Sequence, residues 1–138
     1  MRVLRRSAIA LLVFLGLGAL FGGAMFLSDP DGSRWHMMPV SMLRYSPFHS
    51  WLIPGLILFA ANGLLALYIA WRVMRQRPRY GLWTALQGFV LLGFLATECV
   101  MLRVVMWLHW FYAGVGVALI AVGFALHARW ARDIPRER

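Results

Sequence analysis

Four long apolar stretches, separated by short polar segments, organise the chain. They cover about residues 7–27, 48–71, 81–102 and 105–126. Each is close to the ~20 residues that an α-helix needs to cross the ~30 Å hydrocarbon core of a bilayer. The pattern therefore predicts an all-α fold, an integral membrane four-helix bundle with up-down-up-down topology, forming a single transmembrane domain over residues 1–138.

The third and fourth stretches run almost without interruption, since no Gly or Pro occurs between Phe94 and Ala113. A single helix over residues 81–127 would be roughly 70 Å long at ~1.5 Å per residue, more than twice the thickness of the hydrocarbon core. A turn is therefore required near Arg103. The polar and aromatic residues beside it, Trp107, His109 and Trp110, place this turn at a membrane interface.

The arginines predict the orientation of the chain. Three precede the first stretch, four lie between the second and third, four follow the fourth, and only three lie in the other connections. Because basic residues accumulate on the cytoplasmic side, both termini are predicted to be cytoplasmic and the loop 28–46 external. The tryptophans fall at the two interfaces of this arrangement: Trp35, Trp51, Trp107 and Trp110 outside, and Trp71, Trp83 and Trp130 inside.

The first stretch has a second interpretation. Residues 1–24 have a basic start, an apolar core and small residues at Gly22 and Ala24, as a cleavable signal peptide does. Cleavage would leave three spans with the C-terminus still in the cytoplasm. Against this, the apolar run is long for a signal peptide, and Gly18 and Gly22 form a G-x-x-x-G pattern that favours close packing of membrane helices. We therefore favour retention of the first span.

Composition supports a membrane protein. Of the 138 residues, 62% are hydrophobic and 14% charged, and the mean hydropathy is +0.70, which leaves too few polar groups to cover a soluble domain. The net charge of +9 comes from arginines that mostly flank the apolar stretches, a pattern typical of lipid-headgroup contacts. Membrane lipid is thus a predicted partner and nucleic acid is not. Cys99 is the single cysteine, which excludes an intramolecular disulfide.

Three short motifs carry a family resemblance: Asp29-Pro30-x-Gly32, Ser46-Pro47-Phe48-x-x-x-Leu52-Ile53-Pro54-Gly55 and Trp107-Leu108-x-x-x-Tyr112-x-x-x-Gly116. They resemble those of a family of small, uncharacterised four-span bacterial integral membrane proteins. The resemblance covers nearly the whole chain and implies a multi-pass protein of the bacterial cytoplasmic (inner) membrane, without implying an activity. The chain departs from the family at Glu98 and His109, where glutamine is more typical, and at Arg103, where glycine is.

Glu98 is a carboxylate inside an apolar stretch. Such a residue costs about 2.5–3.5 kcal/mol at the bilayer centre and less towards the interface. About 17 residues separate it from Gly81, which at ~1.5 Å each puts it roughly 25 Å from the cytoplasmic edge, in the outer third. We expect a functional polar cluster here, made of Glu98, Arg103, His109, Arg34 and Arg44; Arg103 can join it if the helix unwinds at the turn. A carboxylate that anchors the outer loops is favoured over one that handles protons or cations.

A polar stripe on the third span is predicted to face the bundle. Gln87 lies eleven residues before Glu98, almost three whole turns, and Thr84 points within about 40° of the same direction. Asn62 on the second span has a similar depth to Gln87, so we expect an interhelical hydrogen bond between them. A permeation path is the alternative, but Leu91 and Phe94 on the same face indicate a dry interior.

Metal and haem sites are weaker alternatives, and no cofactor is predicted. Thioether and imidazole groups suit Cu(I), and the external loop and turn contain several: His36, Met37, Met38, Met42, Met101, Met106 and His109. His49 and His109 are both near outer helix ends and could hold a haem between them. Methionine is also a common filler of apolar surface, which explains its frequency here without a metal.

No complete catalytic or nucleotide-binding motif occurs in the sequence, so function is ranked by class. The first hypothesis is a non-enzymatic structural, assembly or interaction module that associates with a membrane-protein partner, a second copy of itself or lipid. The second is a small proton- or cation-coupled transporter that uses Glu98. The third is a membrane enzyme acting on lipid or quinone.

Overall fold

The computed structural model describes residues 2–29, 31, 47, 50–103 and 105–133. Over these residues it contains helices and no strand: α1 (Arg2–Ser28), α2 (Leu52–Ile57), a π-helical segment η2 (Leu58–Leu64), α3 (Leu65–Met74), α4 (Tyr80–Leu102) and α5 (Trp107–Asp133). The segments α2, η2 and α3 follow one another without a break. The described chain thus has four helical rods, each long and apolar enough to cross a membrane, and the all-helical prediction is confirmed.

The rods extend beyond the apolar stretches at several ends. The first helix starts at Arg2 and the last continues to Asp133, so both include arginines that flank the apolar core. Arginine is a good helix former, and the backbone has no reason to stop where hydrophobicity does. The turn expected near Arg103 is present: Arg103 ends α4 with a left-handed backbone, φ 53°, and its N–H donates to Cys99 O at 2.9 Å.

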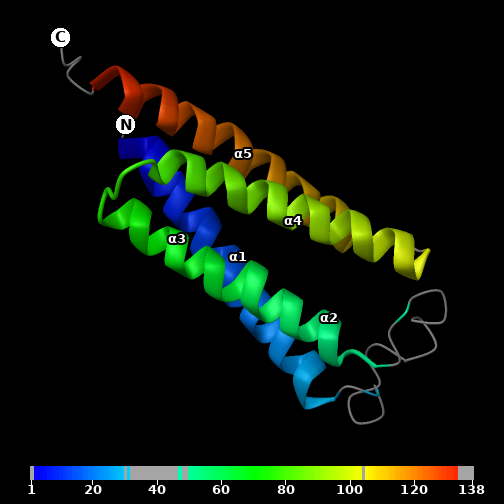
Figure 1. The fold of residues 1–138 in the computed structure, drawn as a ribbon. Coiled ribbons are helices and arrows are strands. Elements are labelled where there is room, and N and C mark those ends of the chain that lie inside the picture. Colours follow the sequence, from blue (N-terminus) through cyan, green and yellow to red (C-terminus); the bar gives the residue numbers. More distant parts are fainter. Residues whose placement is uncertain (1, 30, 32–46, 48–49, 104, 134–138) are drawn as a thin grey trace.

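The four rods form two antiparallel hairpins (Figure 1). The first hairpin pairs α1 with α2, η2 and α3, and the second pairs α4 with α5. The start of α1 and the end of α5 lie at one end of the bundle, which we call the terminal end. The end of α1, the start of α2 and the α4–α5 turn lie at the opposite, distal end.

Glycines set the close approach within each hairpin. A Cβ at Gly88 would lie 2.5 Å from Gly116 O, and one at Gly81 would lie 2.6 Å from Gly123 O, so the pairs face each other seven residues apart on both α4 and α5. Gly23 of α1 has the same role against Phe59, whose Cα would be 2.9 Å from an added Cβ. Small residues at such crossings let membrane-type helices gain dispersion contact.

Three other glycines, Gly18, Gly22 and Gly114, do not make this kind of contact. A Cβ at Gly114 would meet nothing within 4 Å. At Gly18 and Gly22 it would meet only side-chain ends, the Tyr112 hydroxyl at 3.1 Å and Leu58 Cδ2 at 3.3 Å. The G-x-x-x-G pattern of α1 therefore does not form the helix contact; it lines an open space described below.

A π-helical turn in the second rod is coupled to the third. The Leu65 N–H bonds to Ala60 O, five residues back, rather than to Ala61 O, four residues back. The Ala61 carbonyl loses its usual helical donor, and Gln87 Nε2 of α4 donates to it at 3.1 Å. The same nitrogen donates to Asn62 Oδ1 at 3.2 Å. This buried polar contact joins the two hairpins at mid-height.

The hairpins pack most closely towards the terminal end and diverge towards the distal end (Figure 1). Leu12, Ile69, Leu119 and Leu126 are fully buried there. At the connection between α3 and α4, the Arg72 guanidinium covers the Trp83 ring at 4.7 Å and donates to Pro78 O at 2.9 Å. The bundle is therefore closed at one end and open at the other.

Candidate functional site: a distal cleft beside Glu98

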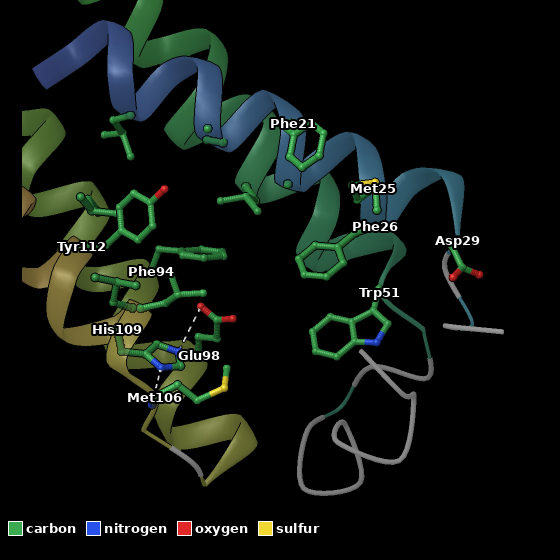
Figure 2. Close-up of a pocket in the computed structure, with 18 residues that line it drawn as sticks. Phe21, Met25, Phe26, Asp29, Trp51, Phe94, Glu98, Met106, His109 and Tyr112 are labelled. Carbon is green, nitrogen blue, oxygen red and sulfur yellow. Dashed lines mark hydrogen bonds and ion pairs between the residues drawn. The ribbon is translucent and has the colours of Figure 1, made fainter. Parts of the chain in front are cut away.

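A cavity of about 310 Å³ lies between the diverging hairpins. One wall is α1 from Leu15 to Phe26, together with Asp29, Trp51 and Leu58. The other is α4 from Leu91 to Glu98, together with Met106 and the start of α5 as far as Tyr112. The lining is almost wholly apolar and rich in aromatic rings (Figure 2). We call this space the distal cleft.

Glu98 and His109 form the polar pair of the distal cleft. His109 Nε2 lies 3.6 Å from Glu98 Oε2, longer than a direct hydrogen bond but within range of electrostatic attraction. His109 is buried, and the Glu98 side chain is 19% exposed. Figure 2 shows the Glu98 carboxyl group on the α4 wall, facing the space between Phe94 and Trp51. The pair is thus accessible to a molecule in the cleft.

The start of α5 fixes the orientation of the imidazole. The Met106 N–H donates to His109 Nδ1 at 3.0 Å, while the His109 N–H donates to Met106 O at 3.0 Å. The first of these bonds is one half of a capping box, with histidine in the place usually taken by Glu or Gln. Because Nδ1 accepts, the ring proton is on Nε2 and faces Glu98.

Aromatic residues form the opposite wall. Trp51 stacks on Phe26 with ring centroids 4.9 Å apart and an interplanar angle of 14°. Only 2% of Trp51 is exposed, so its ring is buried within the protein. Trp51 directly precedes α2, and its contact with Phe26 joins the start of that helix to the last turns of α1 (Figure 2). Tyr112 stands at the inner end of the cleft, stacked against Phe14 at 6.3 Å.

A second cavity of about 260 Å³ adjoins the first between α2, η2 and α4. Its lining includes Pro54, Ile57, Val90, Thr97 and Met101, and it shares four residues with the distal cleft: Phe26, Trp51, Phe94 and Glu98. The rings of Phe26, Trp51 and Phe94 therefore separate the two cavities, and we call them the aromatic partition. Glu98 can be reached from either side of it.

The structure brings together only part of the cluster expected from sequence. Glu98 and His109 meet, and Arg103 is exposed in the turn that follows α4. Arg34 and Arg44 lie outside the described residues, as do His36, Met37, Met38, Met42 and His49. Among the residues that the structure describes, no three His, Cys, Asp or Glu side chains gather as a metal site would require.

The interhelical polar residues are all fully buried. Gln87 meets Asn62 across the hairpins, at the depth their positions along the helices indicate. Thr84 does not take part, because its hydroxyl donates to Tyr80 O within α4 at 2.9 Å. Gln87 Oε1 and Asn62 Nδ2 have no hydrogen-bond partner within the described chain. Neither residue lines the distal cleft, so the contact is a structural brace beside the site.

Sequence reasoning missed most of the cleft. Phe26, Asp29 and Trp51 line it, but the sequence assigned Phe26 only to the first span, Asp29 to the external loop and Trp51 to the outer interface. The usable signal was in α1, where Gly18 and Gly22 leave one face of the helix without side chains. Glycines that have no close neighbour at a helix crossing leave a cleft beside the helix.

The comparisons with known proteins add no assignment. No model of a known protein family matches the chain, and no solved structure matches its fold.

Proposed function

We propose that the protein is a multi-pass, non-enzymatic module of the bacterial cytoplasmic membrane that binds one apolar or amphiphilic molecule in the distal cleft. The positive-inside rule puts the terminal end in the cytoplasm and the cleft in the outer half of the bilayer. Large side chains that point away from the bundle support a lipid setting, since Phe89, Val117 and Phe124 are about half exposed. Membrane lipid is then the most abundant source of a ligand.

The observation that carries this proposal is a half-open apolar space with the Glu98–His109 pair on its wall. Binding sites for small molecules are commonly concave, largely apolar and supplied with a few placed polar groups. In hydrocarbon an unfilled groove also loses dispersion contacts along its whole lining. A bound molecule restores those contacts and gives Glu98 a polar neighbour that an acyl environment lacks.

A cleft-filling substitution tests the proposal. In Gly22→Leu the added Cβ meets only Leu58 Cδ2, at 3.3 Å, so the new side chain extends into the cleft. Gly114→Leu is the matched control, because nothing lies within 4 Å of its Cβ. Native mass spectrometry of protein extracted in mild detergent should find a small molecule retained by wild type and Gly114→Leu and lost from Gly22→Leu. Equal retention by all three would refute binding in the cleft.

Proton-coupled transport is the second candidate, favoured by the contact between Glu98 and His109 at the cleft wall. Beneath the cleft, however, Leu12, Ile69 and Leu119 are fully buried, so a continuous polar path across the bundle would need the hairpins to separate. Glu98→Gln should abolish a proton-coupled flux in proteoliposomes and leave a binding module folded. Flux that survives this substitution would eliminate transport by Glu98. An enzyme acting on lipid or quinone is the third candidate and would use the same cleft.

A further inference from the structure

The charged side chains that line the two cavities are acidic. Glu98 lines both cavities and Asp29 lines the distal cleft, while no arginine of the described residues lines either. The chain as a whole has the opposite balance, with 14 arginines and five acidic residues. The carboxylate of Glu98 is therefore opposite in sign to the net charge of the protein, and electrostatic complementarity favours a cationic ligand beside it.

His109 contacts one oxygen of the Glu98 carboxyl group. Its Nδ1 accepts the Met106 N–H at 3.0 Å, which fixes the ring at the start of α5. Nε2 faces Glu98 Oε2 across 3.6 Å and orients the carboxyl group. The other carboxylate oxygen is available to a ligand on the cleft side (Figure 2).

The walls suit an organic cation rather than a metal ion. Phe26, Trp51 and Phe94 form the partition at Glu98, and Tyr112 closes the inner end. Aromatic faces attract alkylammonium and similar cations placed within about 6 Å of the ring centre. A metal ion would need several oxygen or nitrogen ligands, and the described lining offers too few close together.

We infer that the ligand of the distal cleft is a lipophilic organic cation, with its apolar groups between the hairpins and its charge beside Glu98 and the aromatic partition. This inference rests on the proposed binding function and narrows it to one ligand class. Glu98 supplies the charge, His109 holds the carboxylate in position, and the aromatic rings add cation–π attraction while excluding water.

Two probes of nearly equal size and opposite charge test the inference: the cation tetraphenylphosphonium and the anion tetraphenylborate. Equilibrium dialysis of each radiolabelled probe against purified protein in a neutral detergent gives its affinity. Tetraphenylphosphonium should bind saturably to wild type and Gly114→Leu. Glu98→Gln should weaken it by about tenfold or more, the effect of losing one charge-assisted contact. Glu98→Asp, which keeps the charge, should retain part of the affinity, and tetraphenylborate should not bind saturably.

The outcomes separate this inference from the proposed function. If both probes bind alike, or if Glu98→Gln keeps full affinity for the cation while Gly22→Leu loses it, the cleft binds ligands without selecting cations and the inference is refuted. If Gly22→Leu binds both probes as wild type does, binding is not in the cleft and both proposals fail. Should Glu98→Gln not fold, the comparison of the two probes on wild-type protein decides the question alone.

Discussion

The glycine contact between α4 and α5 gives the sharpest stability prediction. In Gly88→Ala the new Cβ would lie 2.5 Å from Gly116 O and 3.0 Å from Ile120 N. Both are backbone atoms and cannot rotate away. Ordinary contact begins at 3.4 Å, so α5 must move by about 0.9 Å (3.4 minus 2.5 Å) at this crossing. Gly93→Ala on the same helix is the control, because nothing lies within 4 Å of its Cβ.

The comparison of the two variants isolates the packing cost. Alanine gains up to about 1 kcal/mol over glycine in helix propensity, and this gain is common to both substitutions. Overpacking a closely packed contact costs about 1–3 kcal/mol, and only Gly88→Ala incurs it. We therefore expect Gly88→Ala to be less stable than Gly93→Ala by about 1–3 kcal/mol.

Unfolding by sodium dodecyl sulfate in mixed micelles, followed by circular dichroism, gives the free energy of unfolding of each variant. Extrapolation to zero mole fraction of the denaturing detergent follows the same logic as linear extrapolation for urea. Free energies within about 0.5 kcal/mol of each other, the usual spread for neutral surface substitutions, would refute the inferred backbone contact.

Substitutions at three further positions test other contacts in the same assay. Gln87→Leu removes the donor to the Ala61 carbonyl, 3.1 Å away, and should lower stability by about 0.6–2 kcal/mol; wild-type stability would show that the brace contributes nothing. Arg103→Gly relieves a left-handed backbone at φ 53° and should raise stability by about 1–2 kcal/mol; a loss would contradict the strain argument. His109→Gln keeps an acceptor for the Met106 N–H and His109→Ala does not. The Ala variant should therefore be less stable than the Gln variant by about 0.5–2 kcal/mol. Equal stabilities would show that this hydrogen bond does not stabilise the protein.

Features that depend on one helix at a time could be predicted from the sequence. Apolar length predicts four rods, and the impossibility of a roughly 70 Å span predicts the turn at Arg103. Depth along two helices of known direction also places Asn62 opposite Gln87, where the structure has a 3.2 Å contact. These inferences need only the rise per residue and the order of the helices.

Features that depend on helix rotation could not be predicted. A helix that is apolar all round has no polar face to mark which side packs inward. Gly16 and Gly18 are therefore equivalent in the sequence, yet a Cβ at Gly16 would lie 2.7 Å from Leu67 and one at Gly18 meets only the Tyr112 hydroxyl. The contact between Glu98 and His109 could not be predicted for the same reason. Several nearby residues were plausible partners for the carboxylate, and the rotation of the helices decides which of them it meets.

The position of the cleft follows from how the two kinds of helix contact differ. Within each hairpin, glycines bring backbones together along most of the length, as at Gly88 and Gly116, so each hairpin behaves as a rigid unit. Between hairpins the contacts are made by larger side chains, such as Phe14 against Tyr112. Two rigid units that cross at an angle can touch closely over only part of their length. The remainder is necessarily a wedge, and it opens at the distal end because the crossing contact lies below it.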